Sequence, residues 1–135
     1  MKKVLIVLGL LVLAGAYYGY REFNRKNKDL SKENAQVTIT AAEFLKAFQT
    51  NETEANTKYL DKIVAVSGVV SAVNKEANVT KITLDTGDPM SSIICEMDSS
   101  FAAKAMALQK GKSVIIKGVC SGALGDVVCT RCVIQ

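Results

Sequence analysis

The chain has 135 residues, four cysteines and a net charge of +4, with no histidine and no tryptophan. All of the net charge lies in the first thirty residues, because the basic and acidic side chains of residues 31–135 balance. These numbers exclude a histidine-based active site, a disulfide-dense scaffold and a domain that is strongly basic as a whole.

The first predicted element is an apolar helix over residues 4–20. At 1.5 Å per residue it would span about 25 Å, near the short end of what crosses a hydrocarbon core of about 30 Å. Aromatic and basic side chains suited to the membrane interface end the run, namely Tyr17, Tyr18, Tyr20, Arg21, Arg25 and Lys26. We therefore expect residues 1–20 to form a single-pass N-terminal membrane anchor.

A cleaved signal peptide is the alternative for this segment. Lys2 and Lys3 precede a short apolar run that ends in Ala14-Gly15-Ala16, an A-x-A cleavage pattern. A lipoprotein signal is excluded, because Ala16 stands where the lipidated cysteine would have to be. The basic residues after the run favour a cytoplasmic domain, whereas the order of charged, apolar and small-residue regions favours export. We expect a periplasmic or extracytoplasmic domain, with the cytoplasmic orientation as the alternative.

Residues 21–38 are predicted to be a charged stalk or linker, either helical or a disordered tether. The folded domain then covers residues 39–135. It starts with a capping box, in which Thr40 and Glu43 precede an apolar stripe that predicts a short amphipathic helix, formed by Phe44, Leu45 and Phe48. A second polar helical turn leads to two apolar side chains that we expect under the domain, Tyr59 and Leu60.

From residue 62 the hydrophobic period changes from helical to alternating, which predicts strands. A long strand covers residues 63–73, and its central Gly68 indicates a bulge or bend. Residues 81–84 and 93–97 flank a turn, and a capped helix with Phe101, Ala105 and Leu108 on one face follows. The last strands, 114–120 and 127–134, are joined by a tight turn. Three strands, a helix and two strands is the order of an all-β OB-fold, a five-stranded barrel with a helix between strands 3 and 4.

The domain also carries a set of short motifs. They are Tyr59-Leu60-x-Lys62 leading into Ile63 to Val70, Ile94-Cys95, Leu108-x-x-Gly111, Ile116-Lys117-Gly118-x-Cys120-x-Gly122, and Asp126-Val127-Val128 to Cys132-Val133-Ile134. On these residues the domain resembles the bacterial OB-fold family called tRNA-anti-like, over residues 41–135. The resemblance implies an OB barrel, often behind a membrane segment in envelope-associated proteins. The family name records a likeness to anticodon-binding domains, which is an analogy of fold and not an assignment of function.

Nucleic-acid binding is the first alternative function for an OB-fold, and it requires a basic groove with aromatic side chains for stacking. Between Ile63 and Gln135 the only aromatic residue is Phe101, on the expected buried stripe of the helix. The lysines of this region are interspersed with acidic residues. Both features argue against a single-strand binding groove.

The cysteines suggest a second alternative, a metal or redox role, because Cys129-Thr130-Arg131-Cys132 is a C-x-x-C pattern. On a regular strand, residues three apart point to opposite faces, so we expect Cys132 inward and Cys129 outward as a free surface thiol. The remaining cysteines are then buried core residues, Cys95 and Cys120. Cys120 and Cys132 lie on strands that we expect to pair, so they are the candidate disulfide if the domain is exported.

One enzymatic pattern is present in Asp85-Thr86-Gly87, the triplet of retroviral-type aspartic proteases. The competing interpretation is a turn between two strands, since Asp85, Gly87, Asp88 and Pro89 are all turn-forming residues. No serine or cysteine is placed beside a predicted base. We therefore expect no enzymatic activity and no cofactor.

The sequence thus predicts a non-enzymatic, membrane-anchored OB-fold binding module at the cell envelope. It would contact the membrane through residues 4–20 and bind an envelope ligand or a protein partner. OB-folds usually bind through their second and third strands. By alternation, the outward candidates on those strands are Lys81, Thr83, Asp85, Ser92, Ile94 and Glu96.

Overall fold

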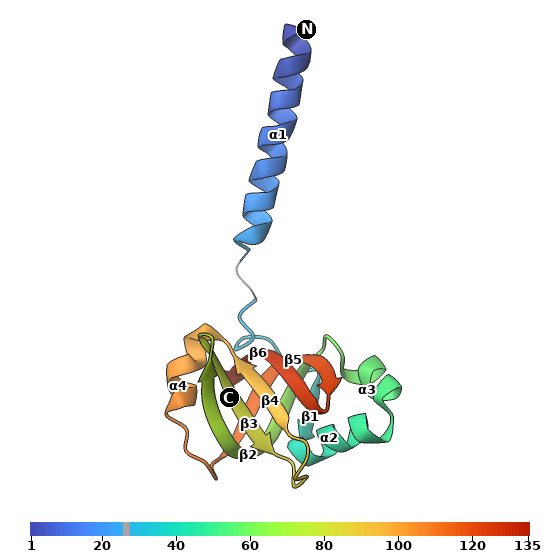
Figure 1. Cartoon of the computed structure of the whole chain (residues 1–135), viewed down its shortest axis with the longest axis vertical. Coiled ribbons are helices and arrows are strands. Elements are labelled where there is room, and N and C mark those ends of the chain that lie inside the picture. The colour runs from blue at the N-terminus through green and yellow to red at the C-terminus, as the bar shows by residue number, and fades with distance from the viewer. Residues whose placement is uncertain (26–27) are drawn as a thin grey trace.

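The structure is a computed structural model that describes residues 1–25 and 28–135 (Figure 1). Lys26, expected as an interfacial anchor, lies outside the described residues. The elements in chain order are α1 (Lys2–Phe23), β1 (Val37–Thr40), α2 (Ala41–Thr50), α3 (Glu52–Tyr59), β2 (Ile63–Glu76), β3 (Val79–Asp85), β4 (Ile93–Met97), a 3-10 turn (Ser99–Phe101), α4 (Ala102–Met106), β5 (Ser113–Leu124) and β6 (Asp126–Ile134).

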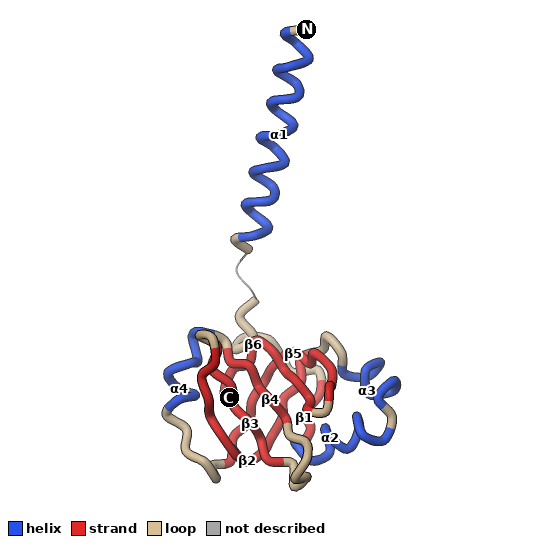
Figure 2. Tube along the Cα trace, viewed as in Figure 1, coloured by secondary structure: helices blue, strands red, loops and turns tan. Residues whose placement is uncertain are grey.

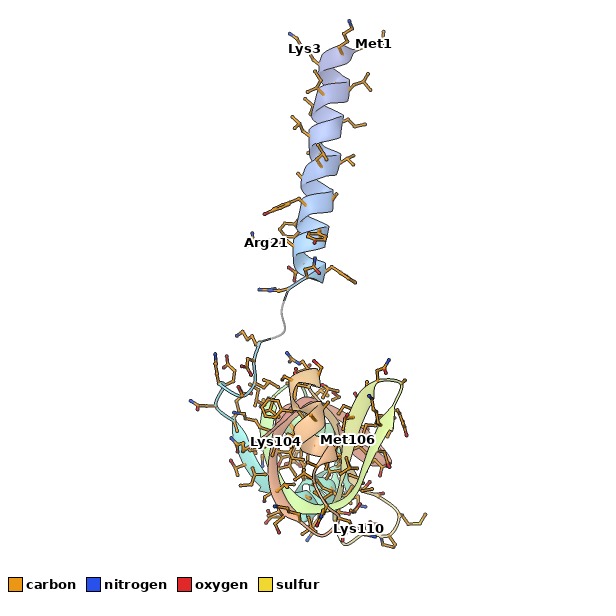
Figure 3. The ribbon with its side chains drawn as sticks, turned by 90° about the vertical axis from the view of Figure 1, so that its left-hand side faces the viewer. Met1, Lys3, Arg21, Lys104, Met106 and Lys110 are labelled. Carbon is orange, nitrogen blue, oxygen red and sulfur yellow. The ribbon has the colours of Figure 1, made fainter. Side chains whose placement is uncertain are left out.

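Helix α1 is long and apolar enough to cross a membrane by length and composition. None of its residues is buried, and its side chains project on all sides (Figure 3). The helix ends at Phe23, and the segment described from residue 28 to residue 36 contains turns and no helix. After Phe23, the described part of the linker therefore does not form the helical stalk that was one of its two expected forms.

The linker instead packs against the barrel. Leu30 is 3% exposed and packs against Val119 and Val133. Lys117, a buried lysine on β5, donates from Nζ to the carbonyl oxygens of Ser31 at 3.3 Å and Glu33 at 2.5 Å. A buried ammonium group needs such acceptors, because an unpaired charge in the interior is costly. Residues 30–33 are therefore fixed to the domain.

The strands form the closed barrel predicted from the sequence, with α4 on one side and α2 and α3 on the opposite side (Figure 2). The long strand β2 closes it, because β2 pairs with β5 over Ile63–Val69 and with β3 over Val69–Glu76. Strand β4 pairs with β3 on one edge and, in parallel, with β6 on the other. This order of five strands with α4 between β4 and β5 confirms the OB-fold.

Strand β1 is an addition that sequence analysis missed. It pairs in parallel with β2, from Val37 opposite Val64 to Thr40 opposite Ser67. Just before it, Gln36 exchanges two hydrogen bonds with Ile63, through its backbone N–H and its side-chain oxygen. Strand β3 starts to pair with β2 only at Val69, which leaves the preceding part of that edge of β2 open. Strand β1 covers this part of the edge.

The two N-terminal helices close one side of the barrel. Thr40 and Glu43 form the predicted capping box, and the apolar stripe of α2 is buried. Phe44 packs edge-on against Tyr59 of α3 with ring centroids 5.2 Å apart. Leu60, expected to be buried beside Tyr59, is 40% exposed, because the chain has already left α3 there.

Gly68 marks the close approach of α2 and not the bulge that we expected at that position. A Cβ atom there would lie 3.1 Å from the Cβ of Ala41. The irregularity in the pairing of β2 with β3 falls between Val70 and Ala72 instead.

Cys129 and Cys132 both point into the barrel, which corrects the expectation of an exposed Cys129. On β4, Cys95 and Met97 are two residues apart, yet their partners on β6, Cys129 and Cys132, are three apart. The extra residue forms a bulge, where Arg131 adopts a φ of 53°. The bulge shifts the alternation by one residue and turns both cysteines inward.

Candidate ligand-binding face

The outward side chains of β3 and β4 form one surface, which we call the β3–β4 face. It consists of the six predicted residues: Lys81, Thr83 and Asp85 on β3, Ser92 just before β4, and Ile94 and Glu96 on β4. Lys81 lies opposite Glu96, and Thr83 lies opposite Ile94. The intervening residues are buried in the core, namely Ile82, Leu84, Ile93, Cys95 and Met97. Strand alternation therefore places the six residues as expected.

Lys81 is already engaged at one end of this face. Its Nζ donates to Glu76 Oε2 at 2.9 Å and lies 3.8 Å from Glu96 Oε1. The hydrogen bond and charge of Glu76 raise the pKa of Lys81 above its ordinary value. The ammonium group is thus neutralised within the protein and is poorly placed to attract a phosphate.

The other end of the face is an acidic depression of about 250 Å³. It is lined by the carboxylates of Asp85, Asp88 and Asp126 and by several hydroxyl groups. Asp126 accepts hydrogen bonds from the backbone N–H of Ser92 at 2.7 Å and from its hydroxyl at 3.0 Å. The adjoining loop tips expose large apolar side chains, Met90 and Leu124. The end of the face thus combines carboxylates, hydroxyls and apolar tips.

Sequence reasoning missed part of this end. Asp88 is held by a hydrogen bond from Gln49 Nε2 of α2 at 2.8 Å, which holds the pKa of its carboxyl below the ordinary value. Asp126 lies between the two predicted last strands, in the segment expected only as a tight turn. Its position next to Ser92 depends on the parallel pairing of β4 with β6, where Ile93 lies opposite Val127, and no local pattern reports that pairing.

The Asp85-Thr86-Gly87 triplet forms a turn. The backbone N–H of Gly87 donates to Asp85 Oδ1 at 2.8 Å, and the hydroxyl of Thr86 donates to the carbonyl oxygen of Ser91 at 2.7 Å. Gly87 has a φ of 78°, which glycine adopts without strain. The triplet therefore has the hydrogen bonds and backbone conformation of a turn, as the turn-forming interpretation predicts.

The four cysteines lie together inside the barrel as free thiols. Cys129 is the cross-strand neighbour of both Cys95 and Cys120, so the partner of Cys120 in the sheet is Cys129 and not Cys132. Burial raises the pKa of Cys129 and of Cys120, and a hydrogen bond with Cys95 together with burial raises that of Cys132. Thiols held in the neutral form are poor nucleophiles and poor metal ligands.

Metal binding needs several ligands that converge on one point. Within residues 1–25 and 28–135, no three cysteine or carboxylate side chains are grouped so that they could hold a metal ion. The described cysteines therefore have the arrangement of core residues.

The barrel, its inserted helix and its outward β3–β4 face define an OB-fold protein with an apolar N-terminal helix. The sequence matches the tRNA_anti-like family over residues 1–134, and the chain belongs to this family. The match confirms the resemblance found in the sequence motifs. A comparison with curated proteins gives no significant match.

Solved structures share the fold but little of the sequence. A lipoprotein from Klebsiella pneumoniae for which nucleic-acid binding has been proposed has a TM-score of 0.61 and 21% identity, covering 72% of this chain and 90% of that one. A protein from Leishmania major Friedlin assigned as an aspartyl-tRNA synthetase has a TM-score of 0.51 and 12% identity, covering 82% of this chain and 22% of that one. At these identities the likeness shows the fold alone.

Proposed function

We propose that this protein is a non-enzymatic binding module, held at the cell envelope by α1, that binds a ligand or protein partner through the β3–β4 face. The observation that carries the proposal is the charge of that face. Lys81 is paired with Glu76, and the opposite end is lined by Asp85, Asp88 and Asp126. Such a surface repels phosphates and accepts hydrogen bonds from cationic or hydroxyl-bearing groups.

The apolar helix supports the membrane part of the proposal. Its length and composition suit a bilayer, and tyrosines and Arg21 lie at its C-terminal end, where an interfacial belt is expected. The Klebsiella pneumoniae protein with the same fold is a lipoprotein, which is also a membrane-attached form. We propose that the barrel lies on the extracytoplasmic side.

Nucleic-acid binding is the competing function, favoured by the proposed activity of that lipoprotein. Single strands bind OB barrels through a basic groove and stacked aromatic rings. Lys81 on the β3–β4 face is neutralised by Glu76. Phe101, in the 3-10 turn after β4, is half-buried against the core. The two functions therefore make opposite predictions for a polyanion: the proposed function predicts that the acidic face repels it, and the competing function predicts that the protein binds it.

The test is a titration of the full chain, in uncharged detergent micelles, with fluorescent single-stranded RNA and DNA at low salt. We expect no saturable change in anisotropy for the native chain. The matched variant carries Asp85→Lys and Asp88→Lys, and we expect it to gain binding that weakens as salt increases, because the repelling carboxylates are replaced by cations.

Two outcomes would contradict the proposal. Saturable, salt-dependent binding by the native chain would establish the competing function, and loss of that binding in Lys81→Met would assign it to the β3–β4 face. A charge-reversed variant that folds but still binds no nucleic acid would show that acidity is not what excludes polyanions from this face.

A further inference from the structure

A second surface of the barrel carries an open groove of about 750 Å³ beside the β3–β4 face. Its floor is the outer side of β2 and β5, where Val69 and Ile115 are 40% and 44% exposed. Leu108 and Ile134 extend this apolar lining. Ser67 pairs with Ile115 and Val69 with Ser113, so the two exposed apolar residues are diagonal neighbours on one face.

Charges of opposite sign flank this apolar centre. Val69 has two cross-strand neighbours, Asp85 on β3 and Ser113 on β5. Their backbones are therefore two strand spacings apart, about 10 Å. Beyond Asp85 lies the acidic depression, and beside Ser113 lies Lys112.

The basic side extends along α4 and the loop after it. Lys104 lines the groove together with Lys112, and Lys110 follows in the loop, as Figure 3 shows for Lys104 and Lys110. Over the part of the chain that the structure describes, none of these three lysines forms an ion pair with a carboxylate. Their charge is available to a partner.

We propose that this β2–β5 surface, with Val69 and Ile115 at its centre, Asp85 on one side and Lys112 on the other, binds a second copy of the chain. A surface with opposite charges on either side of an apolar centre is complementary to itself after a two-fold rotation. In the dimer, Lys112 of each copy lies over Asp85 of the other, and the apolar centres meet. The inference does not rest on the proposed function, although the two share Asp85, which the dimer would cover.

The same charge pattern disfavours other occupants. A polyanion would meet Asp85 and Asp88, and a uniformly basic partner would meet Lys104 and Lys112. The apolar centre is small, which corresponds to a weak dimer. Confinement of two copies to one membrane by α1 would raise their effective concentration and compensate for that weakness.

The experiment measures energy transfer between two differently labelled preparations of the full chain in lipid nanodiscs or uncharged micelles. Two charge-reversal variants, Lys112→Asp and Asp85→Lys, are each expected to weaken association at least tenfold, because each creates two like-charge contacts per dimer. An equimolar mixture of the two variants should restore it, because both contacts in the mixed dimer are again between opposite charges. Lys75→Asp, the same charge change at an exposed lysine of the β2–β3 hairpin, is the control and should associate normally.

Three results would overturn the inference. The first is a native chain that stays monomeric at every concentration tested, and the second is a mixture of folded variants that fails to restore association. The third result is association that survives both charge reversals and Val69→Asp but is lost in Gly15→Leu with Gly19→Leu. Those glycines lie one turn apart on α1 with nothing within 4 Å, a spacing at which membrane helices pack closely, and the dimer would then belong to α1.

Discussion

Gly118 lies where the interior of the barrel has no room for a side chain. A Cβ atom there would overlap Cys132 Sγ and would come within 3.2 Å of the carbonyl oxygen of Thr130. The bulge at Arg131 is what turns the Cys132 side chain toward β5. The glycine, the bulge and the inward cysteine are therefore one packing unit, and each depends on the others.

Replacing Gly118 by alanine is expected to lower the free energy of unfolding by about 1 to 3 kcal/mol, the usual effect of overpacking. The double variant Gly118→Ala with Cys132→Ala should lose less than the sum of the two single variants, because removing Sγ makes room for the new methyl group. Denaturant unfolding of the full chain in micelles measures the three values. Strict additivity would show that the sulfur is not the atom that excludes a side chain.

At the scale of elements, the docked linker is the least expected feature. Its sequence is polar and charged, yet Leu30 enters a small apolar cluster and Lys117 fixes the backbone on either side of Lys32. The lysine comes from β5, more than eighty residues further along the chain. Local composition indicates a solvated linker, and only the tertiary contact fixes its position.

Lys117→Met should release this segment while leaving the barrel folded. The substitution removes both hydrogen bonds to the linker but keeps an unbranched side chain that resembles the aliphatic part of lysine. We therefore expect the free energy of unfolding of the barrel to change by no more than about 1 kcal/mol. Cleavage by trypsin after Lys32 should become at least several-fold faster. Lys75→Met, at an exposed site, serves as the control, and equal cleavage rates in both variants would contradict the role given to Lys117.

Strand alternation predicted the barrel and the outward orientation of the six residues of the β3–β4 face, because a two-residue period follows directly from pleat geometry. That these residues bind a ligand stays a prediction. The period failed at Cys129, because the bulge adds one residue between Cys129 and Cys132 and puts the alternation counted from one cysteine to the other out of step. Strand β1 was missed because four residues carry little pattern and its partner lies in β2. The neutralised Lys81 and the tethered Asp88 depend on Glu76 and on Gln49, which sequence spacing does not connect.

At the scale of the whole molecule, the position of the barrel relative to the membrane remains a proposal with a direct test. The buried native thiols are unsuitable as reporters of sidedness, whereas Leu124 at the β5–β6 turn is 98% exposed. A cysteine introduced there would be the accessible thiol of the domain. The native chain then becomes the background control.

We expect Leu124→Cys to react with a membrane-impermeant maleimide in intact bacterial cells with a permeabilised outer membrane, and the native chain not to react. Labelling of the variant only after lysis would place the barrel in the cytoplasm and contradict the proposed location. Rapid labelling of the native chain would contradict the burial of its cysteines.

The docking of the linker also limits how far the barrel can travel. Seven Cα–Cα intervals separate the end of α1 at Phe23 from the fixed Leu30, so the distance between these two residues is at most about 25 Å when the chain is fully extended. With α1 in a bilayer, the barrel would search only a thin layer next to the lipid surface. The barrel could then bind only partners whose binding sites lie within this distance of the lipid surface. Inserting residues before Leu30 would increase that distance without altering any binding residue.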